Sequence, residues 1–191
     1  MPAPLAEEAS LNVLWVGYGK MGRPMCDRVA AAGHRVSVLD AGAAQRGAAA
    51  ANGLAVVTDP AAAAAEADVL VTSLPDDAAA RDVLVSGSGV LTRCRHGALL
   101  IETSTISAGA SRAIARTAAA VRVAYARAPV SGMVGAAANG LLSSFLSGSD
   151  DALKRLANWA SRCCSVPRSS RCSRRPRAWG WASSTTSPTA S

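Results

Sequence analysis

Short apolar runs and stretches with helical spacing follow one another along most of this chain, and this order predicts strands that alternate with helices. An apolar run that ends at Val16 indicates a buried strand, residues 21–32 have the spacing of a helix, and residues 35–39 indicate a second strand. Gly33 would end the helix before that second strand. The same alternation then predicts strands at residues 54–57, 69–73, 98–102 and 121–126, and helices at residues 43–51, 60–67, 76–85 and 108–120.

Strands that alternate with helices are typical of parallel β-α-β units, so the predicted fold class is α/β, with a Rossmann-type, doubly wound parallel sheet. We expect this domain to span residues 11–159, after an N-terminal extension at residues 1–10. In such sheets, ligands bind outside the carboxyl ends of the strands. Four corners of interest fall at that edge, and they are residues 17–22, Leu74-Pro75, Ser104-Thr105 and Ser131-Gly132. We therefore expect one site there.

The first strand runs into a glycine turn that opens directly into a helix. Gly17, Gly19 and Gly22 have the G-x-G-x-x-G spacing of a dinucleotide-binding turn. The first glycine permits the tight turn, the second lets the backbone approach a pyrophosphate, and the third lets the helix pack closely on the strand. The helix N-terminus presents unpaired N–H groups and a partial positive charge to the phosphates. The turn therefore predicts a pyrophosphate site, and a glycine loop that binds nothing is the alternative.

Asp40 follows the second predicted strand, about 20 residues after the glycine turn, where dinucleotide-binding folds have an acidic ribose ligand. A carboxylate at this place accepts hydrogen bonds from the ribose hydroxyls and repels a 2′-phosphate, which favours NAD over NADP. Arg46 lies close enough in the sequence to change this electrostatic preference, so NADP is not excluded. A solvated residue after a strand is the other interpretation of Asp40.

Composition favours a globular protein of the cytoplasm. Half of the residues are hydrophobic, which allows a packed core. No continuous apolar run reaches the roughly 18 residues of a membrane span, and the acidic Glu7 and Glu8 do not fit a secretory signal. The 5 cysteines are an odd number without the spacing of a disulfide framework, as expected in a reducing compartment. We therefore expect a cytoplasmic protein with no membrane partner.

The net charge of +7 is concentrated at the end of the chain. Every charged residue between positions 160 and 191 is an arginine, so the rest of the chain is nearly neutral. This tail is rich in Arg, Ser, Pro and Cys and lacks an amphipathic period, so we expect it to be disordered. An arginine-rich arm for nucleic acid or an acidic partner is the alternative, which the scattered prolines disfavour. No metal site is expected, because the spacing of zinc ligands is absent.

Taken together, the motifs resemble the β-hydroxyacid dehydrogenase family, which includes 3-hydroxyisobutyrate and 6-phosphogluconate dehydrogenases. The resemblance covers about residues 11–158 and follows the family's order of motifs. It rests on Gly17-Tyr18-Gly19-Lys20-Met21-Gly22-Arg23-Pro24-Met25, Leu74-Pro75, Ser104-Thr105-Ile106 and Ala128-Pro129-Val130-Ser131-Gly132. It implies an NAD(P)-dependent oxidoreductase that transfers a hydride between a small 3-hydroxy acid and the nicotinamide.

The resemblance also implies a role for each matched residue. Leu74 and Pro75 would line the cofactor groove, and Thr105 would approach the nicotinamide ribose or ring. Ser131 and Gly132 would bind the carboxylate of the substrate through a hydroxyl and a backbone N–H. From the residues alone, Ser104-Thr105 has a helix cap as its alternative interpretation, and Ser131-Gly132 has a plain turn. The residues that would hold the pyrophosphate are Gly17, Tyr18, Gly19, Lys20, Met21 and Gly22.

The sequence departs from the family pattern in three ways. Arg127 stands where the family usually has Asp, and Met133 stands where it usually has a second Gly. After residue 159, the family continues with a G-x-G-x-x-x-K-x-x-x-N segment and an all-helical domain, and this sequence has neither. We hypothesise that residues 160–191 are an out-of-frame reading of that continuation. The C-terminal all-helical domain is therefore predicted to be absent, together with most of the interface of the family's homo-oligomer.

The missing segment carries the family's catalytic lysine, which acts as general acid and base on the hydroxyl. The last lysine here is Lys154, which lies outside the motif, so no catalytic residue is predicted. We therefore expect a dehydrogenase by family whose activity is impaired in this chain. The alternatives are a non-catalytic dinucleotide-binding remnant and an enzyme similar to imine reductases.

Overall fold

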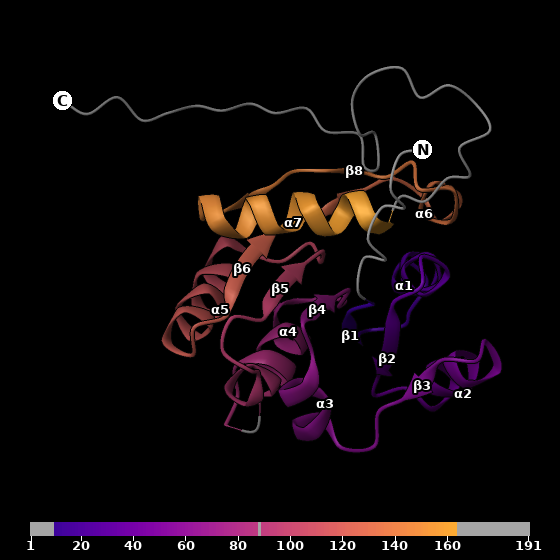
Figure 1. Ribbon diagram of the computed structural model, residues 1–191, viewed down its shortest axis with the longest axis horizontal. Helices are drawn as coiled ribbons and strands as arrows, with labels where there is room; N and C mark the ends of the chain where they lie inside the picture. The colour runs from indigo at the N-terminus through magenta and orange to yellow at the C-terminus, as the bar shows by residue number, and fades with distance from the viewer. Residues whose placement is uncertain (1–9, 88, 164–191) are drawn as a thin grey trace, which may run out of the picture.

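The alternation of strands and helices builds a mainly parallel sheet with helices on both faces (Figure 1). The computed structural model describes residues 10–87 and 89–163 of the 191-residue chain. Within these residues, the strands of the main sheet are β1 (Asn12–Val16), β2 (Arg35–Leu39), β3 (Ala55–Val56), β4 (Val69–Thr72), β5 (Leu99–Glu102), β6 (Ala124–Arg127) and β9 (Ser147–Gly148). Their order is β3-β2-β1-β4-β5-β6-β9. All neighbours are parallel except β9, which pairs antiparallel with β6. The predicted α/β fold class is confirmed.

Helices pack on each face of this sheet. One face contacts α1 (Gly22–Ala31), α2 (Ala43–Ala51) and α7 (Asp150–Cys163). The other face contacts α3 (Pro60–Glu66), α4 (Asp77–Leu84), α5 (Ala108–Ala120) and the 3₁₀ helix η1 (Val90–Arg93). Between β6 and β9 the chain forms β7 (Val130–Ser131), α6 (Val134–Asn139) and β8 (Ser143–Ser144), and β7 pairs with β8 in a separate two-stranded sheet.

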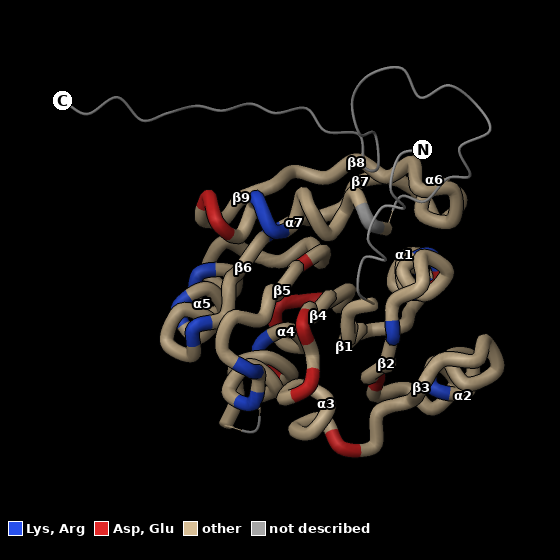
Figure 2. The backbone as a smooth tube through the Cα atoms, viewed as in Figure 1, with Lys and Arg blue, Asp and Glu red and all other residues tan. Residues whose placement is uncertain are grey.

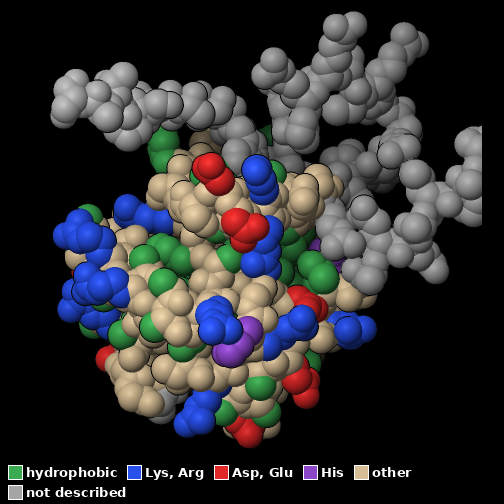
Figure 3. Space-filling model, turned by 60° about the vertical axis from the view of Figure 1, so that its left-hand side comes forward, with side chains coloured by type: hydrophobic (Ala, Val, Ile, Leu, Met, Phe, Trp, Pro, Cys, Tyr) green, Lys and Arg blue, Asp and Glu red, His purple; other side chains and the backbone are tan. Residues whose placement is uncertain are grey.

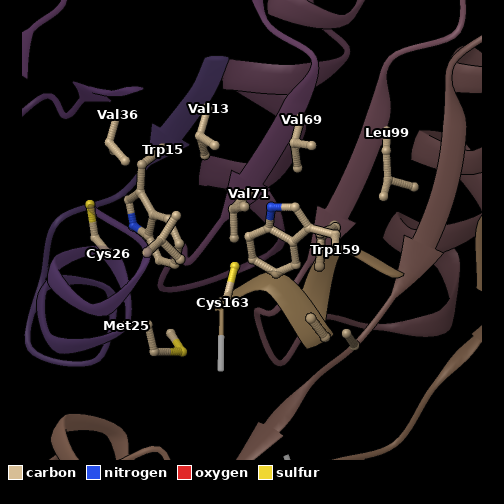
Figure 4. Close-up of a cluster of buried hydrophobic side chains, with 14 of the residues drawn as sticks. Val13, Trp15, Met25, Cys26, Val36, Val69, Val71, Leu99, Trp159 and Cys163 are labelled. Atoms are coloured by element: carbon tan, nitrogen blue, oxygen red, sulfur yellow. The ribbon is translucent and has the colours of Figure 1, made fainter. Parts of the chain in front are cut away.

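Strand β1 explains why the sheet has a core on both sides. Successive side chains of a strand point to opposite faces, so Val13 and Trp15 join the cluster under α1 and α7, while Leu14 and Val16 join the other cluster. All four side chains are at most 2% exposed. Figure 4 shows Trp159 of α7 beside the side chains of β1 and β4 in the first cluster. Burial on both faces accounts for the continuous apolar runs of the central strands.

Three helices begin at the polar caps that the sequence supplies. The Asp59 side chain accepts hydrogen bonds from the backbone N–H groups of Ala61 and Ala62, at 2.9 and 3.1 Å. The Ser107 hydroxyl accepts one from the N–H of Ala110 at 3.2 Å. Both caps satisfy N–H groups that have no partner inside their helix. Asp76 caps α4 in the same way.

Most element boundaries lie within one residue of the prediction, and two differ by three residues or more. Strand β6 begins at Ala124 rather than at residue 121, because Arg122 has a positive φ of 57° in the turn that follows α5. Helix α7 extends to Cys163, beyond the predicted end of the domain at residue 159, and Ala160 and Cys163 are only 3% and 8% exposed. The prediction of disorder was therefore wrong for residues 160–163. Residues 1–9 and 164–191 lie outside the described residues, as does what was predicted for them.

Charged side chains are spread over the described part of the molecule. Figure 2 shows acidic and basic segments in most elements, with several basic positions on α5. On the face shown in Figure 3, acidic and hydrophobic side chains lie among the basic ones. In the ranges that the structure covers, no helix has the length and apolar character needed to cross a membrane.

The register of the strands brings their carboxyl ends to one edge of the sheet. Val16 of β1 pairs with Thr72 of β4, which pairs with Glu102 of β5, which pairs with Arg127 of β6. The loops that leave these strands therefore lie next to one another. Most of the predicted site residues belong to these loops or to segments that continue them. Asp40 follows β2, whose last residue Leu39 pairs with Val16 at the same edge.

Candidate functional site

The glycine turn after β1 has the backbone geometry that its sequence predicts. Gly17 has a φ of +94°, and a Cβ atom there would lie 2.2 Å from the carbonyl oxygen of Ser73. A Cβ atom at Gly22 would lie 2.0 Å from the carbonyl oxygen of Gly17. A Cβ atom at Gly19 would meet nothing within 4 Å. The first and third glycines thus permit close packing of the turn, whereas the second leaves open space beside the backbone.

That open space belongs to a groove of about 750 Å³ at the carboxyl edge of the sheet. The groove has three walls, formed by the glycine turn, by the end of β2, and by the loop between β4 and α4. Most of its exposed lining is apolar, as is usual for small-molecule sites. Eight of the predicted cofactor residues line it together, namely Gly17, Gly19, Lys20, Met21, Gly22, Asp40, Leu74 and Pro75.

Asp40 joins two of these walls. One oxygen of its carboxylate accepts a hydrogen bond from the backbone N–H of Tyr18 at 2.7 Å, and the other accepts one from the N–H of Gly42 at 2.7 Å. Arg46 donates to the backbone carbonyls of Asp40 and Ala41, at 3.0 and 2.6 Å. The guanidinium is therefore held by main-chain oxygens, and the Asp40 carboxylate keeps lone pairs for a hydroxyl donor in the groove.

The side chain of Tyr18 does not line the groove with the other residues of the turn. It is 2% exposed, and its hydroxyl is hydrogen-bonded to the carboxylate of Asp27 and accepts a hydrogen bond from the Asn52 amide at 2.9 Å. Burial, with the hydrogen bond to Asp27, raises the pKa of Tyr18 to about 12. Only the backbone of Tyr18 takes part in the groove, through Asp40. Its side chain joins α1 to the end of α2.

The loop after β5 supports the wall formed by Leu74 and Pro75. The Ser104 hydroxyl accepts a hydrogen bond from the backbone N–H of Leu74 at 2.7 Å. Thr105, the predicted neighbour of the nicotinamide, is exposed and lies outside the groove lining in the described part of the chain. The contact between the loop after β5 and the loop after β4 is thus made by Ser104 and not by Thr105. The helix-cap alternative for this motif does not hold, because α5 is capped by Ser107.

Ser131 and Gly132 also lie outside the groove lining, in the described residues. Ser131 pairs with Ser143 in the sheet formed by β7 and β8, and it is exposed. Gly132 has a φ of +141°, and a Cβ atom there would lie 2.7 Å from the side chain of Leu142. The structure therefore does not bring the predicted substrate residues together with the predicted cofactor residues.

The lysines of the chain are Lys20, which lines the groove, and Lys154 on α7. Lys20 is exposed on the glycine turn, where a cation can approach a phosphate. Lys154 follows the motifs and is not among the groove residues that the structure describes. In the same ranges, no group of three or more His, Cys, Asp or Glu side chains is arranged to hold a metal ion.

Comparison with known proteins gives a consistent result. The model of the NAD-binding domain of 6-phosphogluconate dehydrogenase matches residues 12–165. A probable 3-hydroxyisobutyrate dehydrogenase of Mycobacterium tuberculosis is 35% identical over 144 residues, which are 75% of this chain and 48% of that protein. The chain spans about half the length of the curated relatives it matches.

Two solved structures extend the comparison. The 3-hydroxyisobutyrate dehydrogenase of M. tuberculosis with L-serine has a TM-score of 0.74 and 33% identity, over 79% of this chain and 51% of that one. An imine reductase from Pseudomonas sp. has a TM-score of 0.71 at 19% identity, over 81% of this chain and 53% of that one. The second likeness concerns the fold alone.

Proposed function

Because this chain belongs to the family defined by the NAD-binding domain of 6-phosphogluconate dehydrogenase, we propose that it holds the nicotinamide dinucleotide of a 3-hydroxy acid dehydrogenase. The main support is the groove in which the glycine turn, Asp40 and the Leu74-Pro75 loop face one volume of about 750 Å³. The groups that line this groove match the chemical parts of a dinucleotide, since backbone amides can bind the phosphates, a carboxylate can bind a ribose, and an apolar wall can contact a ring.

In this proposal, the pyrophosphate lies against the open backbone at Gly19 and the N-terminus of α1. The N–H group of Arg23 is bonded to the carbonyl oxygen of Gly19 at 2.9 Å, and Pro24 has no N–H. The groups that would attract an anion are therefore the backbone N–H groups of residues 19–22, at the start of α1. The ammonium group of Lys20 adds positive charge at the same place. The Asp40 carboxylate accepts hydrogen bonds from a ribose and disfavours a 2′-phosphate, so we propose NAD as the preferred cofactor.

The nicotinamide, when bound, would exchange a hydride with the substrate. We propose that this substrate is a small 3-hydroxy acid, because relatives named 3-hydroxyisobutyrate dehydrogenase match the chain along most of its length. Ser131 and Gly132 would bind the substrate carboxylate, and Thr105 would lie near the nicotinamide ribose. For these contacts, the loops that carry them would have to approach the groove more closely.

We further propose that this chain binds the cofactor but is impaired in catalysing the hydride transfer. A general acid or base must reach the reacting hydroxyl within about 3 Å or through one water. Neither Lys20 on the phosphate side nor Lys154 on α7 belongs to the family's lysine motif. An imine reductase activity is not proposed, since only the fold supports it. Cytoplasmic location stays a prediction from the sequence.

A ligand titration tests the binding proposal. Trp15 is buried beneath the turn, and its indole N–H donates to the carbonyl oxygen of Gly17 at 3.0 Å, so tryptophan fluorescence should respond to a ligand in the groove. We expect saturable binding of NAD, weaker binding of NADP, and a reversal of that preference in Asp40→Ser. A folded protein with no affinity for either coenzyme at millimolar concentration would overturn the proposal.

A second measurement separates binding from catalysis. The purified protein is mixed with NAD and 3-hydroxyisobutyrate, and the absorbance of NADH is followed. Binding without turnover is expected for the impaired chain. Turnover at the rate of an ordinary enzyme, on the order of 10 per second, would contradict the proposed impairment while leaving the cofactor site intact.

A further inference from the structure

A row of three polar side chains, two of them fully buried, lies beneath the two loops at the proposed nicotinamide end of the groove. Thr72, Glu102 and Arg127 are register partners on the adjacent strands β4, β5 and β6. Partners in a parallel sheet point to the same face, so the three side chains form one row. Thr72 and Glu102 are 0% exposed. Burying a carboxylate is costly unless its partners compensate, and nothing in the proposed cofactor contacts uses this one.

The contacts of Glu102 lead directly to the groove. One oxygen of its carboxylate accepts a hydrogen bond from the backbone N–H of Ser104 at 2.8 Å. The hydroxyl of Ser104 in turn accepts a hydrogen bond from the backbone N–H of Leu74 at 2.7 Å. Leu74 lines the groove, whereas Glu102 and Ser104 do not. In the described residues, a two-bond chain therefore connects the buried carboxylate to the groove wall.

Arg127 holds the same loop from the next strand. Its guanidinium donates to the carbonyl oxygen of Ile106 at 2.8 Å. The segment from Ser104 to Ile106 is thus fixed near its beginning by Glu102 and at its end by Arg127, and Thr105 lies between these two attachments. Burial raises the pKa of Glu102 above its ordinary value, and hydrogen bonding with Ser104 and Thr72, together with the charge of Arg127, opposes that rise.

The polar groups of this row need an explanation other than filling space in the core. The Nε atom of Arg127 is buried without a hydrogen-bond partner among the described residues. Buried polar groups are nearly always paired, so an unpaired one calls for an explanation. An apolar residue at position 102 would fill the core at lower cost, so the carboxylate has to be explained by its bond to Ser104.

We propose that Glu102 is a positioning residue, which fixes the Leu74-Pro75 wall through Ser104 so that the groove accepts the nicotinamide half of the dinucleotide. The inference rests on the proposed function. It assigns Glu102 no contact with the cofactor, and it explains why a charged residue lies in the core below the loops. The adenine half, held by the glycine turn and Asp40, does not depend on this chain of hydrogen bonds.

The first test compares a whole dinucleotide with its adenine half. Dissociation constants for NAD and ADP-ribose are measured by calorimetry for the wild type, Ser104→Ala, Glu102→Ala and Glu102→Gln. We expect Ser104→Ala and Glu102→Ala to weaken NAD binding about tenfold and ADP-ribose binding less than about twofold, since one lost hydrogen bond has roughly this effect. Glu102→Gln should restore NAD binding, because its amide oxygen can accept from Ser104. Equal loss for both ligands would show a merely structural role and overturn the inference.

Thr103→Val is the matched control. The Thr103 hydroxyl is also buried at the end of β5, but it donates to the carbonyl oxygen of Thr72 at 2.6 Å and not to either loop. This variant should weaken NAD and ADP-ribose binding to the same extent, if at all. A selective loss of NAD binding in Thr103→Val would overturn the inference, because any change to a buried polar group here would then disturb the wall.

The second test needs no cofactor and separates this inference from the proposed function. Hydrogen exchange of the Leu74 amide is measured by NMR in the same variants. The exchange should accelerate at least about tenfold in Ser104→Ala and stay at the wild-type rate in Glu102→Gln. If the wild type bound neither ligand, the proposed function would fail, yet this exchange would still decide the positioning role. An unchanged Leu74 amide in Ser104→Ala and Glu102→Ala would overturn it.

Discussion

The glycine turn and the β7–α6–β8 segment leave the sheet at the same edge, but they differ in how they are fixed. The turn packs against buried backbone, as the 2.2 Å from a Cβ atom at Gly17 to the Ser73 oxygen shows. The β7–α6–β8 segment, taken as residues 130–145, exposes large apolar side chains instead, with Met133, Leu141 and Phe145 at 82%, 73% and 74% exposure. The groove proposed for the cofactor is thus formed by the domain itself, whereas the residues predicted to bind the substrate are not assembled around it.

The largest effect is expected where the turn is tightest. Gly17→Ala places a Cβ atom against the Ser73 carbonyl at a positive φ, so strain and overlap add. The free energy of unfolding should fall by about 4 kcal/mol. Gly33→Ala is the control, because Gly33 has a φ of +90° but nothing within 4 Å of its Cβ position, and its cost should be about 1–2 kcal/mol. Urea denaturation measures both. Equal losses would show that overlap at Ser73 contributes nothing.

The next effect separates folding from binding. Gly19→Val adds a side chain where nothing lies within 4 Å, so the protein should fold, while its branched side chain occupies the space proposed for the pyrophosphate. We expect a loss of NAD affinity of about 100-fold, close to 2.7 kcal/mol. Gly135→Val on α6, which also has open space, should leave NAD affinity unchanged. Calorimetric titration of both variants tests whether binding depends on the turn and not on the β7–α6–β8 segment.

The part of this architecture that the sequence predicts is the part built by local rules. The spacing of the three glycines predicts the groove wall, because each glycine answers a backbone requirement within its own turn. The direction of the Tyr18 side chain could not be predicted in this way, since Asn52, one of its partners, is distant in the sequence. The role of Ser104 was missed because its bond to Leu74 joins loops from two different strands.

Element ends were harder to predict than elements. The apolar residues at 121 and 123 continue the pattern of a strand, but the positive φ of Arg122 makes a turn there, and such a φ leaves no trace in hydrophobicity. The end of α7 did leave a signal, since Trp159, Ala160 and Cys163 have the spacing of one buried helix face. The change in composition after residue 159 obscured it.

A smaller, pH-dependent effect on the free energy of unfolding is expected at the buried side chain of Tyr18 in the glycine turn. Tyr18→Phe removes hydrogen bonds to Asp27 and Asn52 and should cost about 1 kcal/mol near pH 8. The pKa of Tyr18 is raised from 10.0 to about 12 in the folded state, so the stabilisation from its protonated form is complete below pH 10 and is lost as the pH rises to 12. The difference between wild type and variant should therefore shrink over that range. Denaturation at pH 8, 10 and 11.5 measures it, and a constant difference would argue against a raised pKa.

The smallest effect is expected in the β7–α6–β8 segment. Met133 is 82% exposed, so its side chain gains little from folding, and Met133→Ser should change the free energy of unfolding by less than about 0.5 kcal/mol. Leu142, which is 1% exposed in the same segment, provides the contrast, since Leu142→Ala should cost about 2–3 kcal/mol. Thermal denaturation of the two variants compares an exposed side chain with a buried one. A large loss of stability in Met133→Ser would mean that this surface is covered in solution. The contrast between a packed glycine turn and an exposed β7–α6–β8 segment would then be wrong.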